Sequence, residues 1–124
     1  MDPQNPWGTF LDVKYRSLEP FDIQQLVDAN TRPWYNQTLV RINDSVVRLG
    51  VILGEYPWHK HDHEDEFFYV VEGRMLLDVE GQEPIELAER QGISVPAGTS
   101  HRPRAAERTV LLMVEGAGIV PTGD

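Results

Sequence analysis

From residue 36 onward, the chain consists of short stretches rich in Val, Ile, Leu, Phe and Tyr that alternate with turn residues. The turns recur about every 8–12 residues, a spacing typical of an all-β sandwich or barrel. No linker, fixed-period repeat or low-complexity segment divides the 124 residues, which predicts a single domain. The strands expected from this pattern are 36–42, 45–54, 66–72, 74–79, 85–87, 93–95, 101–104 and 109–115.

The two ends of the chain differ from this central region. Residues 1–35 contain four prolines and predict an irregular N-terminal arm that packs on the barrel. Within the arm, a short helix is expected at 23–30 with Asp22 as its N-cap. Residues 116–124 hold three glycines and a proline, and we expect a loose C-terminal tail there. The predicted organisation is therefore an arm (1–35), a barrel (36–115) and a tail (116–124).

The charge balance excludes several classes of partner. Acidic residues outnumber basic ones by 20 to 11, the formal net charge is −9, and no cluster of Lys or Arg appears. Nucleic acids and anionic membranes are bound by such clusters, so neither partner is predicted. The absence of cysteine excludes disulfides and thiolate metal ligands. The first residues carry no secretion signal, and we expect a cytoplasmic protein.

The segment 57–66, Pro-Trp-His-Lys-His-Asp-His-Glu-Asp-Glu, concentrates the chemically versatile residues. Side chains two apart in a strand point to the same face, so His59 and His61 project together. The polar stretch 62–65 can turn the chain and bring Glu66 beside them. Imidazole and carboxylate are ligands for divalent metal ions. The alternative interpretation of these residues alone is a solvated hairpin tip that happens to hold three histidines.

A second motif lies further along the chain, at 96–101. Pro96 fixes its φ angle and Gly98 permits a positive one, so the chain bends sharply just before His101. Such a bend can direct His101 back into the barrel, although an ordinary surface turn has the same composition.

Together the two motifs resemble those of the cupin superfamily, and the resemblance to small single-domain cupins spans about residues 36–115. In the first motif, Gly54 lies one residue nearer to the histidines than the family pattern has it. In the second, Arg90 stands in place of a glycine and Ala105 in place of an asparagine that is not a metal ligand. The positions that match in type and spacing are His59, His61, Glu66, Gly73, Pro96, Gly98 and His101.

This resemblance implies a cupin double-stranded β-helix, a jelly-roll-like barrel of two packed sheets, with one divalent transition metal ion per chain. The implied ligands are His59, His61, Glu66 and His101, and Mn, Fe, Co, Ni and Zn all suit such a set. Pairing His61 with His63 would leave only two residues before Glu66 and would break the match. We therefore expect His63 in an exposed turn or beside the site.

The function implied by the resemblance is chemistry on a small oxygenated metabolite, of isomerase, lyase, cyclase or dioxygenase type. The alternative is a non-catalytic module that binds a metal or a small ligand, for example as a sensor. A sensor usually needs an output domain, and none is evident in the sequence, which favours an enzyme. The resemblance and the apolar stretch 45–54 also predict a homodimer.

Other polar and aromatic residues near the motifs leave alternatives open. Tyr56, Trp58 and Tyr69 either line a small-molecule pocket or pack in the core or a dimer contact. By alternation from His101, Arg102 and Arg104 are expected to point away from the metal. The sequence assigns no catalytic residue.

Overall fold

A computed structural model describes residues 3–124, whose regular secondary structure consists of β-strands and one short helix. Most of the expected strands and the helix lie within one or two residues of their predicted bounds. The elements are β1 (Thr9–Phe10), α1 (Ile23–Ala29), β2 (Tyr35–Ile42), β3 (Ser45–Glu55), β4 (Glu66–Glu72), β5 (Met75–Val79), β6 (Ile85–Leu87), β7 (Gly92–Val95) and β8 (His101–Gly116). Within these described residues, no helix has the length and apolar character that a membrane span requires.

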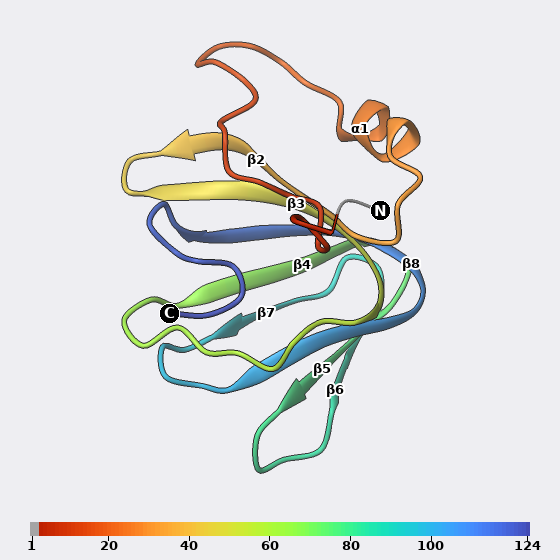
Figure 1. The fold of residues 1–124 in the computed structure, drawn as a ribbon, viewed down its shortest axis with the longest axis vertical. Coiled ribbons are helices and arrows are strands. Elements are labelled where there is room, and N and C mark those ends of the chain that lie inside the picture. Colours follow the sequence, from red (N-terminus) through yellow and green to blue (C-terminus); the bar gives the residue numbers. More distant parts are fainter. Residues whose placement is uncertain (1–2) are drawn as a thin grey trace.

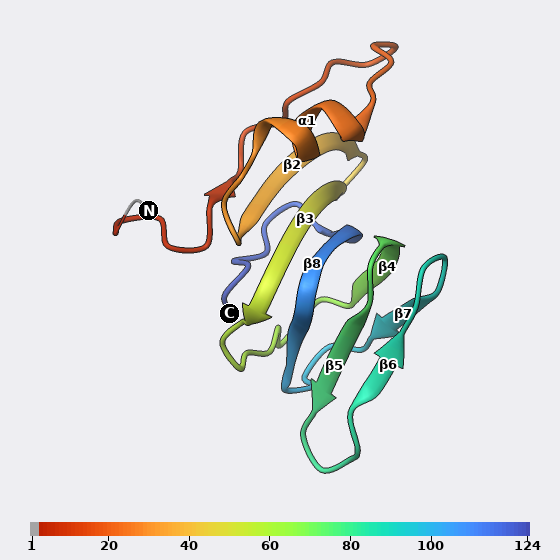
Figure 2. The same cartoon turned by 90° about the vertical axis from the view of Figure 1, so that its right-hand side faces the viewer.

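The strands form one hydrogen-bonded sheet that bends into an open cup and does not close (Figures 1 and 2). β8 is the shared strand, because it pairs antiparallel with β3, β4 and β5. In Figure 2, β2, β3, β8, β5 and β6 lie side by side, with β4 and β7 behind them. The all-β expectation is confirmed. The two packed sheets that were expected appear as two layers of one open sheet, joined through β8.

β8 is longer than the sequence pattern indicates. Residues 101–104 and 109–115 were expected as separate strands because the charged segment between them lacks apolar alternation. The structure makes 101–116 one continuous strand. Its partner β3 shifts register between Ile52 and Gly54, so the extra residues of β8 are accommodated as an irregularity rather than a break. Pairing with three neighbouring strands therefore overrides the local composition.

The N-terminal arm explains the apolar run in β3. Strand β3 lies between β2 and β8, and Gly50 and Ile52 face the interior of the cup. On the opposite face, Leu49 and Val51 are fully buried in a cluster that includes Val27 of α1. Both faces of β3 are thus covered within one chain, so its apolar sequence needs no second copy to cover it.

The helix α1 follows the local rules of its sequence. The Asp22 side chain accepts a hydrogen bond from the Gln24 backbone N–H at 2.9 Å, which confirms the predicted N-cap. The hairpin between β2 and β3 turns at Asn43, whose φ of +53° is one that asparagine tolerates well. These two local features position the arm and the first hairpin around the cup.

The C-terminal tail is docked, in contrast to the loose segment expected from its glycines. The Asp124 backbone N–H donates to Lys60 O at 3.0 Å, and Asp62 N–H donates to Asp124 O at 2.9 Å. Ile119 is buried, with 5% of its surface exposed. The tail thus lies beside the segment that carries the histidines (Figure 1). Its partners come from a distant part of the chain, which local composition does not reveal.

Candidate metal centre

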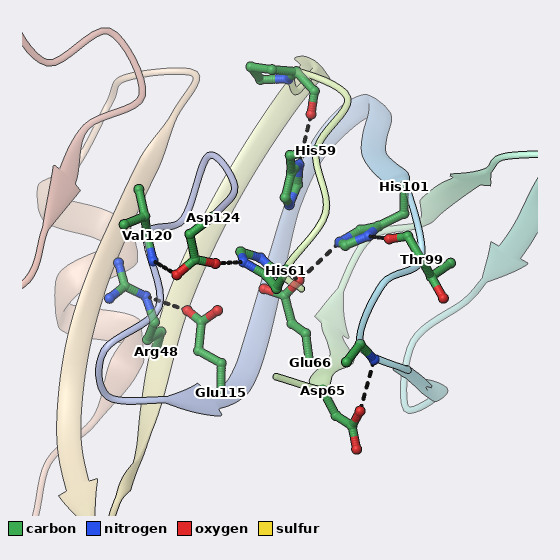
Figure 3. A network of polar contacts seen from close by, with 12 residues as sticks. Arg48, His59, His61, Asp65, Glu66, Thr99, His101, Glu115, Val120 and Asp124 are labelled. Atoms are coloured by element: carbon green, nitrogen blue, oxygen red, sulfur yellow. Dashed lines mark hydrogen bonds and ion pairs between the residues drawn. The ribbon is translucent and has the colours of Figure 1, made fainter. Parts of the chain in front are cut away.

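The backbone brings the two sequence motifs together. His59 lies in the segment after β3 and forms an isolated antiparallel bridge with His101, the first residue of β8. The His59 N–H donates to His101 O at 3.0 Å, and the His101 N–H donates to His59 O at 2.9 Å. Glu66 begins β4, which pairs with the other end of β8. Residues more than 40 positions apart therefore share one end of the cup (Figure 3).

The four predicted ligand residues converge on one buried point. One potential ligand atom from each of His59, His61, Glu66 and His101 lies within 4.8 Å of all the others. All four side chains are buried, with 1–8% of their surfaces exposed. Glu66 Oε1 lies 3.0 Å from His101 Nε2 and 3.6 Å from His61 Nε2. Because metal–nitrogen and metal–oxygen bonds are about 2 Å long, this cluster has a size that one ion can bridge.

Each imidazole is anchored through the ring nitrogen that faces away from the cluster. The His59 Nδ1 lies 2.8 Å from Pro57 O, and the His101 Nδ1 lies 2.8 Å from Thr99 O. The His61 Nδ1 lies 2.8 Å from Asp124 Oδ1 (Figure 3). With Nδ1–H donating to these acceptors, the Nε2 of each ring, once neutral, is the nitrogen that would bind a metal ion.

A buried ring nitrogen without a hydrogen-bond partner indicates whether the cluster suits a cation. Among residues 3–124, the buried Nε2 of His61 has no hydrogen-bond partner. A buried polar atom without a partner destabilises the fold unless something binds it. The cluster of neutral imidazoles and one carboxylate offers borderline and hard donors, so the residues present fit a divalent transition metal ion.

The metal-free site has strongly shifted acid–base properties. Burial alone would raise the pKa of Glu66, but the hydrogen bond with His101 and the nearby His61 ring outweigh it and lower that pKa well below its ordinary value. Burial lowers the pKa of His59. For His61, burial acts in the same direction, but the Glu66 carboxylate 3.6 Å from Nε2 and the hydrogen bond with Asp124 outweigh it and raise the pKa to about 9. Without a metal ion, His61 therefore carries a proton at neutral pH.

A buried ion pair lies beside the cluster and was missed in the sequence. Arg48 Nε lies 3.0 Å from Glu115 Oε1, and both side chains are at most 3% exposed. Arg48 also donates to Asn36 Oδ1 at 2.9 Å and to Thr38 Oγ1 at 2.8 Å. Burial and the neighbouring Glu66 carboxylate raise the pKa of Glu115, whereas the positive charge of Arg48 lowers it and favours the ionised, paired form. Alternation within β3 could have shown that Arg48 points inward with Gly50.

Asp124 is the other residue that the sequence did not indicate. A single aspartate at the end of a glycine-rich segment carries no pattern that would single it out. In the structure, its Oδ1 contacts the His61 ring while its Oδ2 accepts a hydrogen bond from Val120 N–H at 3.3 Å. The tail therefore supplies the one side-chain carboxylate among the three Nδ1 anchors.

The other residues considered in the sequence differ in their burial and in their contacts. His63 is exposed and lies outside the cluster, as expected. Tyr56 is buried with its ring 5.3 Å from the His59 ring, whereas Trp58 is half exposed and packs against the Arg102 guanidinium. Tyr69 is only partly buried and is not among the residues that line the cavity beside the cluster. Arg102 and Arg104 point away from the cluster, and both bind Asp78.

Replacing Asp124 by asparagine tests the role of the tail. Asn keeps the size of the side chain but removes the charge that holds the His61 Nδ1–H. We expect metal affinity to fall about 10–100-fold while the fold is retained, because partners of ligating histidines typically have effects of this size. Competition with a chromophoric chelator would measure the affinity. Asp62→Asn, an exposed neighbour, is the control, and equal affinities for the two variants would contradict the assigned role.

The fold and the cluster define a class: a cup-shaped β-sheet protein with a buried three-histidine, one-glutamate site at one end. Residues 52–115 match the model of the Cupin domain family. The chain therefore belongs to the cupin family.

Comparison with known proteins supports this assignment. The chain is 44% identical over 80 residues to the uncharacterized protein YdbB of Bacillus subtilis, covering 64% of this chain and 71% of that protein. A cupin-2 domain protein from Shewanella frigidimarina shares the fold, with a TM-score of 0.72 and 26% identity over 77% of this chain and 93% of that one. Hydroquinone 1,2-dioxygenase from Sphingomonas sp. TTNP3 shares the fold alone, with a TM-score of 0.72 and 16% identity over 82% of this chain and 33% of that one.

Proposed function

We propose that the protein binds one divalent transition metal ion through His59, His61, Glu66 and His101. The observation that carries this proposal is the convergence of four buried ligand atoms within 4.8 Å, together with an unpartnered Nε2 on His61 among the described residues. The anchored Nδ1 atoms of the three histidines support it, because they orient the rings before a metal binds. Mn, Fe, Co, Ni and Zn all suit this donor set.

We further propose that the centre acts on a small oxygenated metabolite. His59, His61, Glu66 and His101 would hold the ion and leave room beside it for a small ligand. Such an ion would supply Lewis-acid or redox chemistry. Isomerase, lyase, cyclase and dioxygenase reactions all have substrates with an oxygen that can reach the ion. The role of the chain's own residues is to hold the ion in a buried, preorganised place and to exclude bulk water.

Elemental analysis of protein purified without added metal tests the proposal. We expect close to one transition-metal equivalent per chain. Oxygen uptake measured alongside separates the reaction types: iron with oxygen consumption favours a dioxygenase, and zinc or nickel without uptake favours an isomerase, lyase or binding role. Purified protein that has no transition metal and takes up none on addition would contradict the proposal.

Metal binding should depend on pH in a defined direction. The ion needs neutral imidazoles, while His61 in the metal-free protein is protonated below a pKa of about 9. Binding near neutral pH must therefore release a proton, and affinity should rise with pH up to about 9 and fall on acidification. Chelator competition at several pH values, with proton release measured in buffers of different ionisation enthalpy, checks this. An affinity that stays constant from pH 7 down to pH 5 would argue against histidine ligands.

We also propose that the protein is a cytoplasmic homodimer. Because the apolar face of β3 is covered by the arm of the same chain, the dimer rests on the family resemblance rather than on residues 45–54. Light scattering should then give twice the 14.1 kDa of one chain at micromolar concentration. A mass of one chain would reject the dimer without affecting the metal site.

A further inference from the structure

A small cavity lies inside the cup next to the candidate metal centre. Two of the predicted ligands, His59 and Glu66, form part of its lining. Its volume is about 30 Å³, enough for about one or two water molecules. Most of the remaining lining is aromatic or aliphatic, and the side chains important here are Trp7, Trp34, Tyr56 and Phe68.

The aromatic side chains form a connected wall. The Trp7 indole meets the Trp34 ring edge-to-face with centroids 4.9 Å apart, and it meets the Tyr56 ring at 4.8 Å. Trp34 and Tyr56 are themselves 5.4 Å apart. The Tyr56 ring also packs against His59. These offset and edge-to-face contacts are the arrangements in which aromatic rings attract one another, so the wall suits a further flat ring.

The inner end of this region is polar and incompletely paired. Among residues 3–124, the Tyr56 hydroxyl and the Arg48 Nη2 are buried without a hydrogen-bond partner. Tyr56 is 8% exposed, and the charges that act on it are those of Glu66, Glu115 and Arg48. A phenol carries its proton at neutral pH, so the buried Tyr56 hydroxyl is available as a hydrogen-bond donor. An unpaired buried donor beside a cation site points to an oxygen acceptor on a ligand.

Trp7 closes the outer side of the cavity. It belongs to the N-terminal arm, is only partly buried, and precedes β1, which pairs with β2 through two residues. A cavity that takes a benzene ring has about 150 Å³, so a ring cannot enter while the indole of Trp7 remains in place. Trp34 and Tyr56 are buried by the sheet. Trp7 is therefore the aromatic wall residue that reaches the surface, and it is the one that an entering ring would have to displace.

We propose that this cavity is the substrate pocket of the metal centre and takes a flat aromatic molecule with an oxygen substituent. In this arrangement the ring replaces the Trp7 indole against Trp34 and Tyr56. The oxygen lies between the metal and the Tyr56 hydroxyl, which donates a hydrogen bond to it. Tyr56 is thus a specificity-determining residue. The inference rests on the proposed metal-binding function and adds the class of substrate. A sugar fits poorly, because the largely apolar wall would leave most of its hydroxyls unpaired.

The test uses two probes with the same charge and different ring shape, benzoate and cyclohexanecarboxylate. Isothermal titration calorimetry is run on full-length protein loaded with one equivalent of Mn²⁺. We expect benzoate to bind about tenfold more tightly, since each aromatic contact favours the flat ring. Tyr56→Phe should weaken benzoate binding about tenfold or more, because it removes only a hydrogen bond to a charged oxygen. Tyr69→Phe, the same change at a tyrosine outside the pocket, is the matched control.

Trp7→Ala gives a second, independent readout. Removing the indole should strengthen benzoate binding, because the ligand no longer has to displace it. The inference is overturned if Mn²⁺ binds in one equivalent and benzoate fails to bind, binds no better than cyclohexanecarboxylate, or binds equally to Tyr56→Phe. Failure of the protein to bind Mn²⁺ or any other transition metal would instead contradict the proposed metal centre. Metal content measured on every sample keeps the two outcomes apart.

Discussion

Replacing His101 or Glu66 by alanine should remove the bound metal ion and lower the melting temperature in the same variant. Each side chain supplies one of four converging ligand atoms, and each is buried. An ion present at about 1,000 times its dissociation constant stabilises the fold by about 4 kcal/mol, which for a domain of this size is a melting shift of about 10 °C or more. Metal analysis and calorimetric melting of the purified variants measure the two effects.

His63→Ala is the matched control for this experiment. His63 lies two residues from His61 but is exposed and outside the cluster. It should keep the metal content and the melting temperature of the original protein. A His63→Ala variant that loses the metal, beside a His59→Ala variant that retains it, would show that the ligand assignment is wrong. Chelator treatment of the original protein should reproduce much of the melting shift of the ligand variants.

Glu115→Leu should destabilise the protein by about 3–5 kcal/mol, the usual effect of leaving one member of a buried ion pair without its partner. The reason is that Arg48 cannot give up its proton at neutral pH, and both groups are at most 3% exposed. Hydrogen bonds to Asn36 and Thr38 hold the guanidinium in place, so it cannot turn toward solvent without losing them. Urea unfolding at saturating metal measures the change.

The double variant Arg48→Met/Glu115→Leu separates the charge from the packing. It removes both members of the pair and substitutes apolar groups of similar length, which is often close to neutral for stability. We expect it to be more stable than Glu115→Leu alone. A double variant that is as unstable as Glu115→Leu would show that side-chain shape, rather than the unpaired charge of Arg48, causes the loss of stability. Metal content is measured for both variants, because Glu115 lies beside Glu66.

Local sequence patterns predicted the elements well where the structure is determined by nearby residues. The helix at 23–29 and its Asp22 cap depend on contacts within four residues, and the first hairpin depends on its two turn residues. The strand ends at 66–72 and 85–87 agree with the turn residues that bound them. The prediction was wrong in separating 101–104 from 109–115, because β3 pairs with β8 on both sides of the segment between them, through Ala105 and Thr109, and keeps the strand continuous.

The residues of the candidate site also fall into two groups, those that the sequence indicated and those that only the structure revealed. His59, His61 and Glu66 were found from spacing, and His101 from the turn before it together with the family resemblance. Asp124 lies 63 positions from His61, so no local pattern connects the two. The Arg48–Glu115 pair likewise joins two strands that are distant in sequence. Neither contact has a signature in residue type or spacing.

The amino-acid sequence by itself therefore determined that the chain forms an all-β cupin and which four side chains are the candidate ligands. The all-β pattern and the shared face of His59 and His61 follow from alternation and spacing over about ten residues, a range within which the backbone geometry of a strand or turn fixes side-chain direction. The cupin assignment and the full ligand set came from the resemblance of the two motifs to those of the family. Only the tertiary structure decided that the tail supplies Asp124 to His61, that a charged pair is buried behind Glu66, and that Trp7 closes the aromatic cavity. Such contacts arise when distant segments pack together, and their positions depend on the whole fold.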